Sequence, residues 1–257
     1  MPTKRCRRWI RPCLLVGNVA APVAMISTWF QVPWLIAATI LLHGCFCYAV
    51  VAPNCDWFGP VVSQFATDQK EVWLTIDDGP AGAETQRLAA ELRARGAVAT
   101  FFVQGRRLAQ DPKAAAEIQA AGCTLANHTQ THPTHAFYWL RRRTLREEIA
   151  ACSRALNFAG IHLQQWFRSP VGLKHVWLHR ELDRAGLRLI GWSVRGRDGV
   201  SSDPEVVARR VVARVHPGAI IVLHEGKPRS VEGILGVVDA LQERGYTFVI
   251  PGDYQLL

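Results

Sequence analysis

The fold is decided by residues 71–80, EVWLTIDDGP, in which an apolar run ends at two adjacent acidic residues. The β-branched and aromatic side chains of this run are typical of a strand that is buried on both faces. Asp77 and Asp78 come directly after it, where buried carboxylates require a metal ion or another cation to compensate their charge. An acidic turn that caps a helix is the alternative, because Asp is a good capping residue. We therefore expect a buried strand with a charged site at its carboxyl end.

Strand and helix patterns alternate along the rest of the chain. Because each crossover helix returns the chain to the same edge of the sheet, this alternation predicts a parallel α/β sheet. About seven such units favour a (β/α) barrel, in which the chemistry lies at the carboxyl ends of the strands. Further strands are expected at 97–103, 123–126, 165–168, 187–194, 219–223 and 246–249, and helices at 85–95, 114–121, 144–158, 175–185, 204–215 and 231–244.

The first 55 residues predict a membrane anchor. Five basic residues precede residue 12, and no charged residue occurs from Pro12 to Cys55. A break at 29–34 divides the uncharged stretch into two spans, near 13–30 and 34–52, which would form a transmembrane helical hairpin. A cleaved signal peptide in the first segment and a helix at 34–52 buried in the soluble domain are the alternatives. The expected domains are a membrane anchor at 1–55 and a catalytic domain at 56–257.

The positive charge of the chain is concentrated at its N-terminus. The formal net charge is +9, and five basic residues lie before residue 12. Basic residues beside an apolar stretch mark the cytoplasmic side of a membrane, so this distribution favours membrane association and no nucleic acid binding. Two spans would return the chain to the cytoplasm, so the catalytic domain is expected to face it at the inner cell membrane. The seven cysteines are odd in number and include no CxxC pair, which predicts free thiols in a reducing compartment.

Two further polar clusters follow later strands. His128 and His132 are four residues apart, a spacing that places both imidazoles on one side of a single turn, where they can share a metal ion. His175 and His179 have the same spacing inside an amphipathic helix that carries no paired acids, and we assign them a structural role. His224 ends a late strand, where a histidine can act as a proton donor. These clusters predict a metal-dependent site.

Together these motifs resemble the polysaccharide deacetylase family, also called the NodB-homology family or family 4 carbohydrate esterases. The resemblance covers residues 70–250 and implies a distorted (β/α) barrel of about seven units. The motifs that carry it are, in order, TIDDGP at 75–80, ATFFV at 99–103, NHTQTHP at 127–133, RSPVG at 168–172 and IVLH at 221–224.

The resemblance also implies a role for each polar residue. Three protein ligands leave one position open, as a catalytic zinc site requires. A general base activates the attacking water, and a general acid protonates the leaving amine. The residues that match the metal ligands, usually of zinc, are Asp78, His128 and His132. The residues that match the base, the acid and the arginine that orients the base are Asp77, His224 and Arg168.

The sequence departs from the family pattern at residues 192–199, WSVRGRDG. Asp198 keeps the acid that ends the usual motif, and we expect it among the catalytic residues. Arg195 and Gly199 replace an Asp and a Trp, and Val171 stands where an aromatic residue is common. These changes remove aromatic walls and add positive charge, which disfavours a linear polysaccharide as substrate. The expected substrate-binding residues are Pro170, Gly172, Trp192, Arg195 and Leu223.

The implied function is metal-dependent hydrolysis of an N-acyl group, above all N-acetyl, from an amino sugar. The membrane anchor, the charge at Arg195 and the arginines at 106–107, 141–143 and 146 favour a sugar carried by a membrane lipid, because basic clusters attract anionic head groups. Other possible substrates are peptidoglycan or a chitin-type polysaccharide outside the cytoplasm, an O-acetylated xylan, and a formylated lipid-linked aminoarabinose. A catalytically inactive glycan-binding relative and a structural membrane protein are the alternatives to an enzyme.

Overall fold

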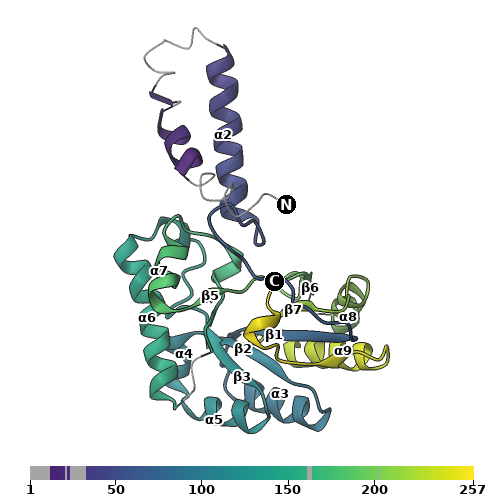
Figure 1. Cartoon of the computed structure of the whole chain (residues 1–257). Helices are drawn as coiled ribbons and strands as arrows, with labels where there is room; N and C mark the ends of the chain where they lie inside the picture. The colour runs from purple at the N-terminus through teal and green to yellow at the C-terminus, as the bar shows by residue number, and fades with distance from the viewer. Residues whose placement is uncertain (1–11, 21, 24–32, 161–163, 202) are drawn as a thin grey trace.

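The computed structural model describes residues 12–20, 22–23, 33–160, 164–201 and 203–257. A parallel sheet lies at the centre of the main domain, helices pack around it, and helix α2 (Pro33–Val51) projects away from the domain (Figure 1). The architecture is a distorted parallel half-barrel. It confirms the expected α/β class and parallel sheet, with a barrel that is more open than the sequence predicted.

Eight strands form the sheet within the described residues. The pairings between these strands are all parallel, as the alternation of strands and helices predicted. The strand order is β5-β4-β3-β2-β1-β7-β6, and β8 pairs with the start of β1. The strands are β1 (Glu71–Gly79), β2 (Ala99–Val103), β3 (Thr124–Asn127), β4 (Trp166–Phe167), β5 (Arg188–Leu189), β6 (Val194–Arg195), β7 (Ala219–His224) and β8 (Thr247–Phe248).

The helices fall close to the expected ranges, with one addition. α4 follows β2 directly and was not expected, because its six residues, GRRLAQ, are too few to show a helical period. The helices after α2 are α3 (Ala83–Ala94), α4 (Gly105–Gln110), α5 (Lys113–Ala120), α6 (Arg142–Phe158), α7 (Leu178–Ala185), α8 (Pro204–Val212) and α9 (Ser230–Gln242).

The two faces of β1 serve different purposes. Side chains alternate across a strand, so Leu74 and Ile76 lie on the outer face, in an apolar cluster with residues of α3, α8 and α9. Trp73 lies on the inner face, where its ring centroid is 4.7 Å from that of Trp166. Asp77 is four residues further along the strand and falls on the same inner face. The side chains on the inner face of β1 therefore begin in an aromatic core at Trp73 and end with the carboxylate of Asp77 at the carboxyl end of the strand.

The single strand predicted at 187–194 is two strands in the structure. β5 forms one edge of the sheet, and β6 forms the other edge beside β7. Between them, the Gly191 N–H donates to the Val62 carbonyl at 2.7 Å, and a Cβ at Gly191 would lie 2.6 Å from the Asn54 side chain. This close contact with the segment before β1 interrupts the sheet pairing. One continuous segment therefore contributes to both edges of the sheet.

Among the described residues, α2 alone is long and apolar enough to cross a membrane. It coincides with the second predicted span, whereas the prediction of a hairpin with two spans is wrong for the described residues. The first predicted span covers residues 13–30. Its first part belongs to a short helix at 12–20, whereas residues 21 and 24–30 lie outside the described residues. The short helix contacts α2 through Asn18, whose side chain donates to the Leu42 carbonyl at 3.2 Å.

These observations revise the predicted anchor. Only Ala49 and Val50 of α2 are buried, so α2 is not a helix of the domain core. It is an N-terminal apolar helix of the kind found in signal sequences and membrane anchors. The cytoplasmic orientation of the catalytic domain required two spans, and it loses its support with only one.

Lys174 joins the end of α2 to the domain. Its backbone N–H donates to the Val50 carbonyl at 3.0 Å, and its ammonium group donates to the Ala52 carbonyl. These carbonyls lie at the C-terminal end of the helix, where the helix dipole favours a cation. Burial lowers the pKa of Lys174 to about 8, although Cys55 and Asp56 oppose the shift. The helix is therefore fixed to the domain by a buried lysine.

Three arginines surround one buried carboxylate between α6 and α7. The Glu181 side chain is fully buried, and its oxygens lie 2.6 Å from Arg142 Nε, 2.8 Å from Arg146 Nε and 3.2 Å from Arg184 Nη1. Burial would raise the pKa of Glu181, but the hydrogen bonds from Arg146 and Arg142 lower it to about 2. Arg142 and Arg146 are therefore structural, which removes them from the basic cluster that was expected to attract head groups.

We expect Glu181→Gln to destabilise the domain by about 1–3 kcal/mol, because an amide leaves the surrounding guanidinium groups uncompensated. The loss is measured as the free energy of unfolding in urea at pH 7. In the wild type, the stabilisation from Glu181 should be complete above its ordinary pKa of 4.5 and should disappear as the pH falls through about 2.

The matched control is Glu147→Gln on α6, because Glu147 is 64% exposed and pairs only with Arg154, which is 63% exposed. This control should change the stability by less than ~0.5 kcal/mol. Equal losses in the two variants would contradict the structural role of Glu181.

Candidate active site

A bulge at the end of β1 directs two adjacent carboxylates into one site. Neighbouring side chains of a regular strand point to opposite faces, so Asp77 and Asp78 would ordinarily diverge. Here the pairing with β2 shifts register between Asp77 and Gly79, and Asp78 has a φ of 77°. Asp adopts this left-handed conformation more readily than most residues. The irregular strand end therefore places both carboxylates in the same cavity.

Asp78, His128 and His132 form the one group in the described part of the chain that could hold a metal ion. Their ligand atoms lie within 4.8 Å of one another. Asp78 Oδ1 is 3.3 Å from His132 Nε2 and 3.8 Å from His128 Nε2. Two imidazoles and one carboxylate suit zinc and several other divalent ions. His175 and His179 do not join this group, and His175 Nε2 lies 2.9 Å from the Leu140 carbonyl.

Both histidines direct the same ring nitrogen toward Asp78. His128 Nδ1 is 2.8 Å from the Arg168 carbonyl, so Nδ1 carries the proton and Nε2 is left as the ligand atom. His132 Nδ1 is 3.1 Å from the Thr134 hydroxyl. Burial lowers the pKa of His132 to about 4, and the neighbouring His128 contributes to this shift. His132 is therefore neutral at pH 7, which is the form that binds a metal ion.

The position of Asp78 is supported by two residues of the β2–α4 region. Gln104 Nε2 donates to Asp78 Oδ1 at 3.2 Å, and Arg107 donates to the Asp78 carbonyl at 3.0 Å. Burial would raise the pKa of Asp78, but His128, His132 and other positive charges lower it. Neither contact could be predicted from the sequence, because both depend on the position of α4, which has no sequence signal of its own.

Arg168 is buried at the centre of the site. Its Nη1 donates to Asp77 Oδ1 at 2.8 Å and to the Thr75 hydroxyl at 2.6 Å. Its other nitrogens donate to the Ile190 carbonyl at 3.2 Å and the Gly191 carbonyl at 2.9 Å. Burial lowers the pKa of the guanidinium, and the charge of Asp77 opposes this shift. An arginine in a protein keeps its proton, so Asp77 faces a permanent positive charge.

His224 and Asp198 form a second pair on the adjacent strand. His224 lies beside Asp77 in the register between β7 and β1. Its Nδ1 is 2.9 Å from Asp198 Oδ1, and its backbone N–H donates to Asp198 Oδ2 at 2.6 Å. Burial would lower the pKa of His224, but the hydrogen bond and the charges of Asp198 and Asp77 raise it. The charged imidazolium is therefore favoured, as a proton donor requires.

A cavity of about 110 Å³ brings the polar residues of β1, β3 and β7 together. Among the expected substrate-binding residues, Trp192 and Arg195 line this cavity. Val171, which replaces an aromatic residue, lines it as well. Besides the metal ligands, Asp77 and His224, the cavity is also lined by Arg197, Gly199, Val200, Val222 and Lys227.

Three residues that were expected to bind substrate, Pro170, Gly172 and Leu223, do not line the cavity. Leu223 packs among the helices on the outer face of β7, because Val222 and the residue after Leu223 occupy the inner positions of the strand. Pro170 and Gly172 are buried and do not line the cavity. A Cβ at Gly172 would lie 2.7 Å from the Trp192 ring, so this glycine permits the loop to pack against the cavity wall.

Glu225 is a buried carboxylic acid next to the irregular end of β1, and no motif revealed it. One of its oxygens accepts a hydrogen bond from the Thr85 hydroxyl, and the other has no hydrogen-bond partner. The second oxygen occupies the space that a Cβ at Gly79 would fill. Burial raises the pKa of Glu225 to about 7, against the opposing effects of Thr85 and Arg107. Its place directly after His224 was the only available signal.

Comparison with known proteins agrees with this arrangement. The protein-family model described as polysaccharide deacetylase matches residues 65–190. A chitooligosaccharide deacetylase from a Bradyrhizobium species is 31% identical over 195 residues, which cover 69% of this chain and 87% of that protein.

Two solved structures share the fold. A family 4 carbohydrate esterase from Streptomyces lividans, solved with acetate, has 28% identity and a TM-score of 0.67, and the match covers 75% of this chain and 98% of that chain. A family 4 pseudoenzyme from Bacillus anthracis has 26% identity and also a TM-score of 0.67, with 73% of this chain and 66% of that chain covered. Activity therefore has to be argued from the residues of the site and not from the fold.

We expect the stability of the metal-free protein to decrease as the pH rises from the ordinary Glu225 pKa of 4.5 through about 7. The folded protein binds the Glu225 proton more tightly than the unfolded chain does, so ionisation favours unfolding. Glu225→Gln should remove this decrease, which amounts to as much as ~3 kcal/mol at about 1.4 kcal/mol per pKa unit. Urea unfolding between pH 5 and pH 8, with a chelator present, measures both profiles.

The control for this experiment is Glu243→Gln, which removes an exposed carboxylate at the C-terminal end of α9. Its stability profile should follow that of the wild type. Parallel profiles for the wild type and Glu225→Gln would show that Glu225 does not titrate in this range.

Proposed function

This chain belongs to the polysaccharide deacetylase family and is a carbohydrate N-deacetylase, and we propose that it removes an acetyl group from the nitrogen of an amino sugar. The proposal is carried by one observation: a metal-ligand group, an Asp–Arg pair and an Asp–His pair share one site. Ligands, a base and an acid are the three parts that amide hydrolysis requires. A catalytically inactive glycan-binding relative has no need of all three, so the complete set supports an enzyme.

Asp78, His128 and His132 are the residues that would hold a divalent ion, and we propose zinc because of the His/His/carboxylate set. The residues fit such an ion, since both Nε2 atoms face Asp78 Oδ1 and the Nδ1 atoms have other partners. When bound, the ion would polarise the amide carbonyl of the substrate.

Asp77 is the proposed general base. Arg168 binds its Oδ1, whereas its Oδ2 lies 4.0 Å from His128 Nε2 and therefore borders the metal ligands. A water that attacks the acyl carbon in this cavity would give its proton to Oδ2. The role of Arg168 is to orient the carboxylate and to compensate its charge in a buried position.

His224 is the proposed general acid. Asp198 occupies its Nδ1, so Nε2 is the nitrogen that can donate a proton to the amine as the carbon–nitrogen bond breaks. Asp198 stabilises the imidazolium before the transfer and fixes the orientation of the ring. Asp77 and His224 are neighbours in the sheet, so base and acid both reach one bound substrate.

The volume of the cavity supports a small acyl group. A cavity of about 110 Å³ has room for a small acyl group such as acetyl beside the metal ligands. Trp192 and Val222 provide apolar surface for a methyl group. The name of the bradyrhizobial relative, chitooligosaccharide deacetylase, supports an N-acetylated amino sugar over an O-acetylated xylan.

A sugar carried by a membrane lipid is the second candidate substrate, and the attachment of α2 favours it. The loop after Arg168 contributes Val171 to the cavity and, three residues later, Lys174 to the end of α2. The apolar helix and the catalytic cavity are therefore connected through one short loop. If residues 1–55 anchor the catalytic domain at 56–257, this connection would keep the cavity close to the bilayer.

The side of the membrane that the domain faces depends on the number of spans. With the basic N-terminus in the cytoplasm, one span places the domain outside and two spans place it inside. A C-terminal reporter that is active only outside the cytoplasm distinguishes these topologies. Reporter activity would favour a peptidoglycan- or chitin-like substrate, and its absence would favour a lipid-linked sugar at the cytoplasmic face.

We expect Asp77→Asn to retain bound metal and to lose turnover by a factor of about 10²–10⁴, because the general base is removed while the three ligands remain. Asp78→Asn should lose the metal as well as the activity. Metal content by mass spectrometry and deacetylation of N-acetylchitooligosaccharides measure the two effects. Thermal unfolding of both variants verifies that the fold is retained.

The reverse pattern would exchange the two roles. If Asp77→Asn loses the metal while Asp78→Asn keeps it, Asp77 is the ligand and Asp78 the base. Full activity of Asp77→Asn would reject the proposed base.

A further inference from the structure

We propose that Arg195, Arg197 and Lys227 form a phosphate-binding subsite beside the metal ligands, so that the enzyme prefers an amino sugar that carries a phosphate group. This inference rests on the proposed function and names the substrate class of the same site. The three side chains line the cavity that also contains Asp78 and His132.

None of these three cations has an acidic partner within ion-pair distance among the described residues. The nearby carboxylates are already engaged, because Asp77 in the cavity pairs with Arg168, and Asp198 behind the cavity wall pairs with His224. Elsewhere in the domain, arginines with acidic partners include Arg87, Arg95, Arg142, Arg146, Arg154, Arg184, Arg188 and Arg209. The positive charge at the cavity is therefore available to a ligand.

Arg195 is the last residue of β6, and Arg197 lies in the turn that follows it. The Arg195 guanidinium lies 5.8 Å from the centroid of the Trp192 ring, a cation–π contact along the cavity wall. Arg197 has a φ of 54°, and its carbonyl accepts from the Val200 N–H at 3.0 Å and from Arg210 at 3.3 Å. These contacts fix the backbone that presents both side chains to the cavity.

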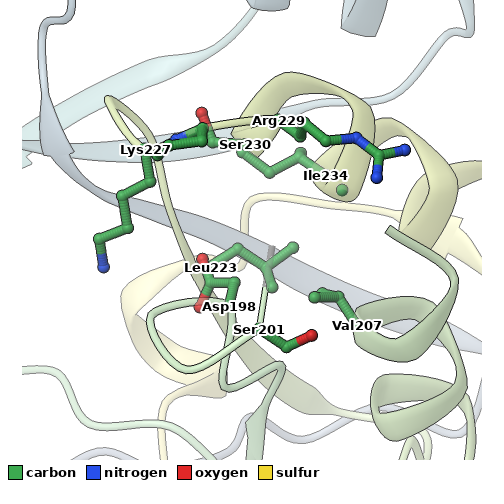
Figure 2. A pocket seen from close by; sticks show the side chains of 10 residues that line it. Asp198, Ser201, Val207, Leu223, Lys227, Arg229, Ser230 and Ile234 are labelled. Carbon is green, nitrogen blue, oxygen red and sulfur yellow. The ribbon is translucent and has the colours of Figure 1, made fainter. Parts of the chain in front are cut away.

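Gly199 gives Lys227 access to the cavity. A Cβ at Gly199 would lie 3.2 Å from Lys227 Nζ, so a bulky residue there would displace the ammonium group. Figure 2 shows the neighbouring pocket, in which Lys227 extends on the Asp198 side while Arg229 points away from it. Gly199, which replaces the usual Trp of the family, therefore leaves space for the Lys227 ammonium group at the cavity.

Charge and shape together favour phosphate. Guanidinium groups bind phosphate oxygens through paired N–H donors, and an ammonium group adds a point charge. When the Asp77–Arg168 and Asp198–His224 pairs are counted as neutral, the three cations exceed the single carboxylate of Asp78 by two positive charges. An uncharged polysaccharide does not compensate this excess, whereas a phosphate on the sugar does.

The test compares three substrates: an N-acetylhexosamine 1-phosphate, the same sugar on a polyprenyl phosphate, and uncharged diacetylchitobiose. We expect kcat/KM to be about tenfold or more higher for a phosphorylated substrate at low salt, and the difference to shrink at high salt. In the combined variant Arg195→Gln, Arg197→Gln and Lys227→Gln, the preference should fall by about tenfold, mainly through KM.

The matched control is Arg229→Gln, which removes a cation from the same loop as Lys227. Arg229 is exposed and points away from Asp198, so this variant should keep the preference for phosphate. If the soluble sugar phosphate and the lipid-linked sugar are preferred equally, a sugar phosphate is the ligand. If the preference is confined to the polyprenyl substrate, the phosphate belongs to a lipid. Either result supports the subsite.

A binding measurement separates this inference from the deacetylase assignment. Isothermal titration calorimetry with N-acetylhexosamine 1-phosphate and with the unphosphorylated sugar requires no turnover. Tighter binding of the phosphorylated sugar, lost in the triple variant, supports the subsite even if neither sugar is hydrolysed. Equal affinity for the two sugars, or a triple variant that keeps the preference, overturns the subsite and leaves the deacetylase assignment intact.

Discussion

The buried ion pair between Arg168 and Asp77 is the contact on which the other parts of the site depend. The Arg168 guanidinium binds the proposed base and the carbonyls of Ile190 and Gly191, while its own carbonyl binds Nδ1 of His128. One residue therefore fixes a carboxylate, a metal ligand and the segment that joins the two edges of the sheet. Removal of one partner from such a buried pair typically costs about 3–5 kcal/mol, because the other charge is left uncompensated.

The surroundings of this ion pair make it effective. The guanidinium carbon of Arg168 lies 4.2 Å from the centroid of the Phe102 ring and 5.7 Å from the centroid of the Trp192 ring. Aromatic faces attract a cation and exclude water, and electrostatic interactions are stronger in such a dry environment. The inner face of the half-barrel thus combines an apolar core with a charged end, and the alternation of side chains along β1 keeps the two in one continuous row.

The elements with a clear sequence period were the ones that the sequence predicted well. β1, β7 and the longer helices show their pattern over enough residues, and the motifs at their ends contain the polar residues that meet in the cavity. The errors have physical causes. The strand at 187–194 divides because Gly191 packs against Asn54 and Val62, and α4 is too short to show a period. Glu225, Gln104 and Arg107 act through contacts between distant segments, which no local pattern records. Leu223 was expected at the cavity because the motif was assigned as a block, without regard to the two faces of β7, and it lies on the outer face.

The attachment of α2 through Lys174 has a practical consequence for protein production. Phe58, Leu173 and Val176 pack with the end of α2, and the Lys174 ammonium donates a hydrogen bond to the carbonyl of Ala52. A shortened, water-soluble version that begins after residue 52 would uncover this apolar surface and leave a buried cation without its acceptor. The disturbance would reach the cavity through Val171, only three residues away. Kinetic constants from such a version would describe an altered enzyme, so the full-length chain is the appropriate reference.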